Sequence, residues 1–148
     1  MFQPRLLLLA FAFLLSGCAN AGSWVELGGQ RYQVEIADDD AERARGLMFR
    51  DELAAGTGMV FLHDREEPQA YWMKNTKIPL DILYFDNARK LVAQQRDVPP
   101  CSAGDGCPPY PSKAPARYVL ELNAGEAARL KLQNGAELVF SKDIPAQP

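Results

Sequence analysis

Two apolar segments flank a charged, amide-rich turn in Tyr71-Trp72-Met73-Lys74-Asn75-Thr76-Lys77-Ile78-Pro79-Leu80-Asp81-Ile82-Leu83-Tyr84-Phe85. From Leu80 to Phe85 both alternating faces are mostly apolar, which is typical of a strand covered on both sides. The turn keeps its polar side chains near solvent, where a scaffold commonly holds binding groups. The stretch therefore predicts a buried strand and, beside it, a candidate site.

The rest of the chain carries short strand patterns and few helical ones. Residues Trp24–Leu27 and 32–36 alternate around a glycine pair, which predicts a hairpin. Asp39 and Glu42 fit the capping box that begins a helix, and Gly46 fits the glycine that ends one. We therefore expect a helix of about two turns between Asp39 and Gly46. Further strands are expected at residues 58–62, 71–73, 81–85, 91–97, 118–122 and 137–141, and a helical turn at 126–130. These elements predict a mainly β fold, a compact jelly-roll-like sandwich or barrel of seven to eight short strands with one or two short helices.

The N-terminal segment resembles the signal peptide of a bacterial lipoprotein. Arg5 supplies a positive charge, and residues 6–15 supply an apolar core that is too short to span a bilayer of about 30 Å. The core leads into Leu15-Ser16-Gly17-Cys18, which resembles a lipobox, so we expect Cys18 to be acylated. Ordinary secretion, with cleavage after Ala19-Asn20-Ala21, is the alternative. A lipid anchor would hold the protein on the periplasmic face of an envelope membrane. The absence of Asp at position 19 resembles outer-membrane sorting.

The expected organisation is a signal peptide at 1–17, a tether at 18–23, a single β domain at 24–143 and a frayed tail at 144–148. The chain has 16 basic and 19 acidic residues, and removal of Arg5 with the signal peptide gives a net charge of −4. Basic residues do not cluster in the sequence, which argues against a nucleic-acid partner.

Cys101 and Cys107 lie in a predicted loop at residues 98–115 that holds six of the eleven prolines. In an oxidising envelope such a pair predicts a disulfide. A redox-active pair is the alternative, but catalytic pairs are normally C-x-x-C beside a helix N-terminus. The spacing therefore favours a structural staple for a long loop.

Several polar residues of the central segment and its surroundings are candidates for binding. Asp81 begins a buried face and needs a partner, either an N–H group of the 74–76 turn or Arg45. It could instead be a ligand-binding or catalytic carboxylate. Trp72 could stack on a flat ligand or belong to the core. Arg45, Arg50 and Lys74 could bind an anionic group or form a solvated face.

We expect no metal and no cofactor. Met48, Met59 and Met73 with His63 could suggest copper, but their apolar neighbours indicate core methionines. The single histidine excludes a zinc site built on several histidines. The sequence has no phosphate-binding glycine loop.

Six blocks of the sequence occur in a recognisable order, namely residues 43–50, 58–61, 72–76, 79–82, 110–112 and 118–122. Together they resemble the domain-of-unknown-function 192 family, from about residue 24 to residue 141. The resemblance implies a compact, mostly β, jelly-roll-like fold that is often exported, and it implies no established activity. The motif positions carried by the resemblance are Arg45, Gly46, Met48, Arg50, Trp72, Met73, Asn75, Thr76, Pro79, Asp81 and Glu121.

We expect a lipid-anchored envelope domain that binds a small ligand, a glycan or an envelope protein. The expected rim comprises Arg45, Trp72, Lys74, Asn75 and Asp81, with Arg50, Thr76 and Glu121 as further candidates. One alternative is a hydrolase-type enzyme that uses Asp81 or Glu121 as acid/base, which two carboxylates facing each other across a cleft would favour. Another is a structural assembly factor, which a flat apolar patch would favour.

Overall fold

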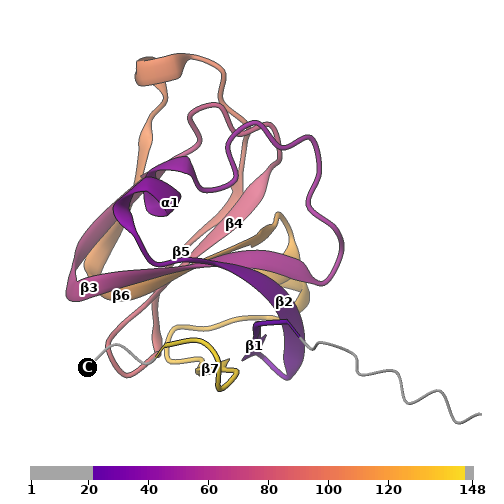
Figure 1. The fold of residues 1–148 in the computed structure, drawn as a ribbon, viewed down its shortest axis with the longest axis vertical. Helices are drawn as coiled ribbons and strands as arrows, with labels where there is room; N and C mark the ends of the chain where they lie inside the picture. Colours follow the sequence, from indigo (N-terminus) through magenta and orange to yellow (C-terminus); the bar gives the residue numbers. More distant parts are fainter. Residues whose placement is uncertain (1–21, 146–148) are drawn as a thin grey trace, which may run out of the picture.

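A single curled sheet of seven strands forms the protein in the computed structural model, which describes residues 22–145 (Figure 1). The mainly β prediction is confirmed. The strand order is β5-β4-β6-β3-β2-β1-β7. β2 and β3 pair in parallel, and all other neighbouring strands in this order pair antiparallel. The elements are β1 (Trp24–Leu27), β2 (Gln30–Ala37), α1 (Asp40–Arg45), β3 (Thr57–Trp72), β4 (Leu80–Phe85), β5 (Leu91–Val98), the 3-10 turn η1 (Gly104–Gly106), β6 (Pro109–Asn123), α2 (Glu126–Arg129) and β7 (Leu138–Phe140).

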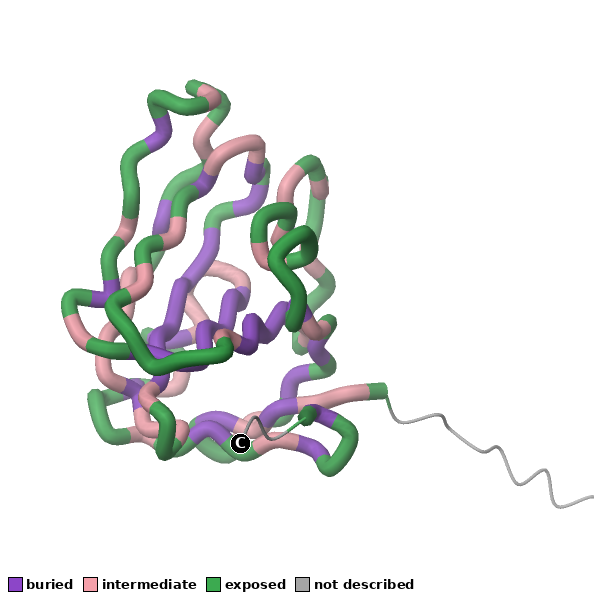
Figure 2. Tube along the Cα trace, turned by 60° about the vertical axis from the view of Figure 1, so that its left-hand side comes forward, coloured by how far each residue is buried: buried purple, intermediate pink, exposed green. Residues whose placement is uncertain are grey.

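β4 lies between two apolar clusters, one on each face of the strand, as its sequence predicts. Leu83 and Phe85 belong to one cluster, and Leu80, Ile82 and Tyr84 belong to the other. All six residues of β4 are buried, and buried segments run along the central strands in Figure 2. The sheet curls so that both faces of its central strands are covered.

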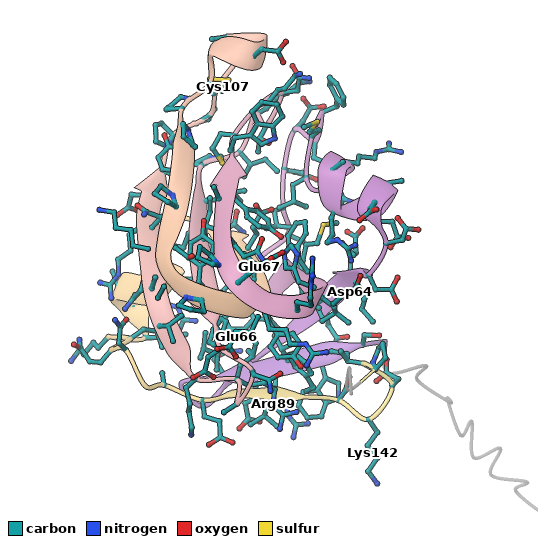
Figure 3. All side chains as sticks on the ribbon, turned by 90° about the vertical axis from the view of Figure 1, so that its left-hand side faces the viewer. Asp64, Glu66, Glu67, Arg89, Cys107 and Lys142 are labelled. Carbon is teal, nitrogen blue, oxygen red and sulfur yellow. A yellow bond between two sulfur atoms is a disulfide. The ribbon has the colours of Figure 1, made fainter. Side chains whose placement is uncertain are left out.

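β3 and β6 are longer than the sequence predicts. The predicted strand at 58–62 and residues 71–72 of the predicted strand at 71–73 are parts of β3, which continues between them through the exposed acids Asp64, Glu66 and Glu67 (Figure 3). The prediction of a loop over residues 98–115 is wrong for 109–115, which belong to β6. This part of β6 contains Pro109, Pro111 and Pro115. Its pairing with β3 tolerates these prolines because the register shifts twice between Leu62 and Ala70. Ser112 Oγ accepts a hydrogen bond from the Gln69 backbone N–H at 3.0 Å and so replaces a ladder bond.

The C-terminal end of the described chain packs against the core. Ile144, expected in a frayed tail, is buried in the core, and its N–H donates to the Ser141 carbonyl at 3.2 Å. The expected signal peptide and the expected lipidation site, Cys18, lie outside the described residues. Within residues 22–145 no helix is long and apolar enough to cross a membrane.

Candidate functional site

A small cavity lies where α1 and its following loop meet the end of β3 and the C-terminal part of β6. Its volume is about 30 Å³. Four of the candidate residues line it, namely Arg45, Trp72, Thr76 and Glu121. The remaining lining residues are Arg43, Ala44, Gly46, Leu47, Met48, Phe61 and Tyr71. We call this space the Glu121 cavity.

Glu121 supplies the buried acid of the cavity. It sits on β6 opposite Met59 of β3 and Ile82 of β4, so its side chain shares their face of the sheet. Only 5% of the residue is exposed, and no described residue forms a hydrogen bond with its carboxyl group. Among the described residues no fully enclosed side-chain oxygen lacks a partner, so the Glu121 oxygens must open onto the cavity.

Burial decides the protonation state of this acid. Desolvation raises the pKa of Glu121 to about 8. The carboxyl is therefore protonated at neutral pH and presents both an O–H donor and a carbonyl acceptor to the cavity.

Tyr71 and His63 continue the polar wall of the site. The Tyr71 hydroxyl lies 3.0 Å from His63 Nε2, and the Tyr71 ring packs edge-on against Phe61 and Tyr84. Burial, and then the charge of Glu121, raise the pKa of Tyr71, so the phenol stays neutral. Burial, and then the charge of Arg43, lower the pKa of His63. Sequence reasoning missed Tyr71, although its place directly before Trp72 in a strand implies that one of the two side chains points inward.

The two arginines of α1 that line the cavity differ in their freedom. Arg43 is fixed, because it donates to the backbone carbonyls of Asp38 at 2.8 Å and Leu62 at 2.7 Å and pairs with Asp40 at 2.6 Å. Arg45 is exposed, and no described residue forms a hydrogen bond or ion pair with it. Its guanidinium is therefore available to an incoming group.

Local sequence signals place α1 at the cavity. Asp39 accepts the Glu42 N–H at 2.8 Å, and Gly46 ends the helix by donating to the Glu42 carbonyl. Gly46 has φ +45°, and a Cβ at this position would lie 3.3 Å from the Phe61 ring. Glycine is therefore required both by the backbone conformation and by the close approach of α1 to β3.

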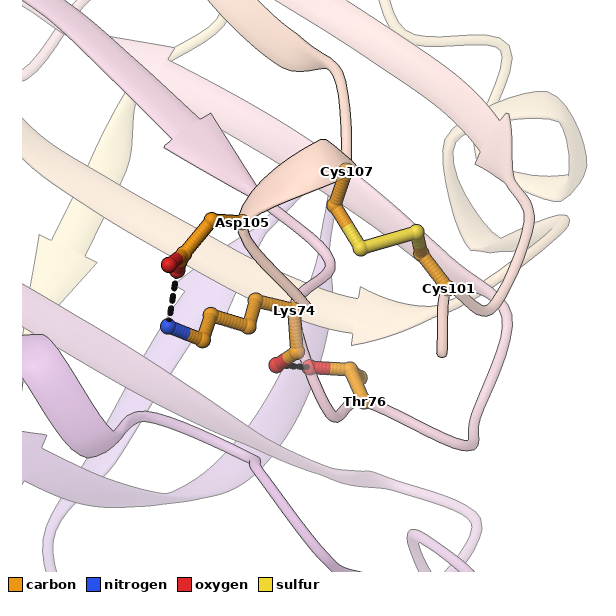
Figure 4. Close-up of a disulfide and its surroundings, with 5 residues drawn as sticks. All are labelled: Lys74, Thr76, Cys101, Asp105 and Cys107. Atoms are coloured by element: carbon orange, nitrogen blue, oxygen red, sulfur yellow. Dashed lines mark hydrogen bonds and ion pairs between the residues drawn. A yellow bond between two sulfur atoms is a disulfide. The ribbon is translucent and has the colours of Figure 1, made fainter. Parts of the chain in front are cut away.

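The turn after β3 forms the outer side of the site. Trp72 is 42% exposed, and Lys74 Nζ lies 4.8 Å from its ring centroid. Lys74 also pairs with Asp105 (Figure 4). Asn75 has φ +54°, and its carbonyl accepts the Phe49 N–H at 2.8 Å.

A disulfide holds the next loop against this turn. The predicted bond between Cys101 and Cys107 is present, with a Cα–Cα distance of 6.0 Å (Figure 4). The Cys101 N–H donates to the carbonyl of Thr76 at 3.3 Å. Because Thr76 lines the cavity, the disulfide loop braces one of its walls.

Asp81 and Arg50 lie outside the cavity. Asp81 is fully buried and accepts the backbone N–H groups of Asp97 and Ala127, each at 2.8 Å. The prediction that Arg45 or the 74–76 turn partners Asp81 is therefore wrong. Since Ile82 pairs with Glu121, Asp81 points to the opposite face of the sheet, and the two carboxyls do not face each other.

Arg50 forms a two-pronged ion pair with Glu35, with Nη2 2.6 Å from Oε2. It lies at surface hollows beside β2 rather than at the Glu121 cavity. Among the described residues no group of three or more His, Cys, Asp or Glu side chains could hold a metal ion.

Comparison with known proteins gives a family and a fold. The DUF192 family model, described as "Uncharacterized ACR", matches residues 23–140. A protein of unknown function from Novosphingobium aromaticivorans is 35% identical, with 78% of this chain and 82% of that chain covered and a TM-score of 0.72. A protein from Sinorhizobium meliloti described as a putative transcription regulator is 33% identical, with 81% of this chain and 95% of that chain covered and a TM-score of 0.73. No curated protein matches the chain.

Proposed function

Because this chain belongs to the DUF192 family, an uncharacterised one, we propose its function from the site itself: it is a binding module that receives one compact polar group of a ligand in the Glu121 cavity.

The observation that carries the proposal is the convergence of the motif positions. Six of the positions that carry the family resemblance line one cavity, although they come from three separate parts of the chain. They are Arg45, Gly46, Met48, Trp72, Thr76 and Glu121. Packing alone does not require a free guanidinium, a half-exposed indole and an unpartnered buried acid at the same place.

The size of the cavity limits what can enter. A space of about 30 Å³ holds a group comparable to one or two water molecules, whereas sites for whole drug-sized ligands measure about 300–1,000 Å³. An adjoining surface hollow of about 350 Å³ shares Arg43, Ala44, Tyr71 and Trp72 with the cavity. The body of a small ligand, a glycan or a peptide would lie in this hollow, against Trp72, while one of its groups enters the cavity.

The proposal includes an envelope setting. A lipid on Cys18 would anchor the chain through a short tether that leads to β1. β1 lies at the end of the molecule opposite η1, and η1 belongs to the loop braced against the site (Figure 1). An anchored domain would therefore present its site away from the membrane surface.

The test is to block the cavity mouth in the full chain, purified from membranes. Ala44 is exposed on α1 and lines both the cavity and the adjoining hollow, so Ala44→Phe should fill the mouth. Ala128→Phe, at an exposed position of α2, is the matched control. The probes are N-acetylglycine, N-acetylglycinamide, N-acetylglucosamine and ethylammonium, and titration calorimetry measures their binding. We expect at least one probe to bind the wild type and the control but not Ala44→Phe. Absence of binding by all four probes would refute the proposal.

One observation supports an enzyme as the second candidate. A carboxyl with a pKa of about 8 beside a solvent-accessible space has the properties of a general acid. In this candidate Glu121 acts alone, because Asp81 lies on the other face of the sheet. Hydrolysis of a bound probe by the wild type but not by Glu121→Gln would favour it over simple binding.

A further inference from the structure

We propose that the group received by the Glu121 cavity is a carboxylate, held by the Glu121 carboxyl as hydrogen-bond donor and by Arg45 as the cationic partner. This inference rests on the binding function proposed above and names the chemical class of the ligand.

The charges around the cavity favour an anion. Two arginines line it, and Glu121 is the one acid among the lining residues. Arg43 is already held by two carbonyls and by Asp40, whose carboxylate offsets its charge, so Arg43 is not the cation left for a ligand. Arg45 has no partner among the described residues, and its planar guanidinium matches a carboxylate in two parallel hydrogen bonds.

Glu121 must act as a donor for this ligand. A protonated carboxyl donates one O–H, and a ligand carboxylate only accepts, so the two groups can share the proton. The other titratable groups that face Glu121 add no negative charge that would oppose a ligand carboxylate. Tyr71 from β3 and Tyr84 from β4 stay neutral because burial raises the pKa of each, and the groups from α1 are the two arginines.

The competing occupant is an ammonium group, for which the aromatic walls could supply cation–π contacts. An ammonium would require the Glu121 proton to be lost and would enter a cavity lined by the cationic Arg45, which has no partner among the described residues. Both conditions disfavour it relative to a carboxylate. The two occupants predict opposite pH dependences, which makes them separable.

The pH dependence follows from the proton on Glu121. Above the pKa of about 8 the carboxyl ionises and repels a ligand carboxylate, so affinity should fall about tenfold for each further pH unit. An ammonium would instead bind more tightly as the pH rises. Glutamine at position 121 keeps an N–H donor at every pH, so it should bind a carboxylate with little change between pH 6 and pH 9.

The experiment compares N-acetylglycine with its uncharged amide, N-acetylglycinamide, and with ethylammonium. Titration calorimetry at pH 6 and pH 9 is done on the full-length wild type, Glu121→Gln, Arg45→Ala and the control Arg65→Ala, which removes an exposed arginine that lines none of the hollows described above. We expect N-acetylglycine to bind better than the amide at pH 6 and about tenfold more weakly at pH 9. Arg45→Ala should weaken binding at least tenfold, Arg65→Ala should not, and Glu121→Gln should remove the pH dependence.

The outcomes separate this inference from the proposed function. The carboxylate assignment would be overturned if ethylammonium bound more tightly than N-acetylglycine, or if N-acetylglycine bound more tightly at pH 9 than at pH 6. The proposed binding function would still stand in that case, provided that Ala44→Phe abolishes binding. If no probe binds, the binding function itself fails. Should Glu121→Gln misfold, the wild-type pH profile still decides, because it needs no substitution at Glu121.

Discussion

Glu121→Gln should make the stability of the domain less dependent on pH. In the folded protein burial raises the pKa of Glu121 from its ordinary 4.5 to about 8. The folded state therefore keeps a proton that the unfolded chain releases, and this stabilises the fold fully below pH 4.5 and progressively less as the pH rises toward 8. One pKa unit corresponds to about 1.4 kcal/mol, so the contribution lost between pH 5 and pH 7 is about 2–3 kcal/mol.

The assay is urea unfolding of wild type and Glu121→Gln at pH 5, 6 and 7 with the disulfide intact. From pH 5 to pH 7 the free energy of unfolding of the wild type should fall by about 2–3 kcal/mol more than that of the variant. A fixed difference of about 1–3 kcal/mol from an imperfectly paired amide does not affect the slope. His63, whose pKa is lowered by burial, contributes a slope of opposite sign in both proteins, and it cancels in the comparison.

Parallel pH profiles for the two proteins would refute the reasoning. They would mean that the Glu121 carboxyl is ionised in the folded state or is stabilised by a partner, and the cavity would then lack the donor that we assign to it.

Three further predictions concern other parts of the chain. Asp81→Asn should lower the free energy of unfolding by about 1–3 kcal/mol, because the amide replaces one of two acceptors for backbone N–H groups; urea unfolding measures this, and an unchanged midpoint would contradict it. Replacement of Cys101 and Cys107 by Ser should cost about 2 kcal/mol by the chain-entropy model, again by urea unfolding, with no loss expected if wild type is first reduced. Mass spectrometry of the membrane fraction should find an N-terminal diacylglyceryl modification on Cys18, whereas a soluble product that starts at Gly22 would favour ordinary secretion.

The strands and the helix that local patterns specify were predictable from the sequence. β4 shows apolar residues on both faces and is buried on both. The capping residues Asp39 and Gly46 place α1 within one residue of its observed bounds. These elements are predictable because the relevant interactions lie within a few residues of one another.

The lengths of β3 and β6 were not predictable, because long-range pairing decides them. The charged residues 64–67 and the prolines of 109–115 each resemble a loop by composition. They are strands because the two segments lie opposite each other and extend a pairing that begins at Gly58 and Leu122. Tertiary context here overrides local preference.

The site was predictable in part. Arg45, Trp72, Thr76 and Glu121 are brought together, whereas Asp81 is not. The distinction between Asp81 and Glu121 depends on the register of β4 against β6, and a shift of one residue would exchange their faces. Composition and spacing do not contain that register, so the sequence alone puts Asp81 in the expected rim and Glu121 only among the further candidates.

The contrast between these two acids is the strongest argument that the cavity has a function. Asp81 and Glu121 are both buried on adjacent strands, but Asp81 accepts two backbone N–H groups and Glu121 has no described hydrogen-bond partner. A structural role accounts for Asp81, because it ties β4 to residues 97 and 127. No such role accounts for Glu121, whose burial raises its pKa and so makes the fold less stable at pH 7 than in acid solution. A buried acid that weakens the fold and opens onto a cavity beside a free arginine is better explained by a bound ligand than by packing.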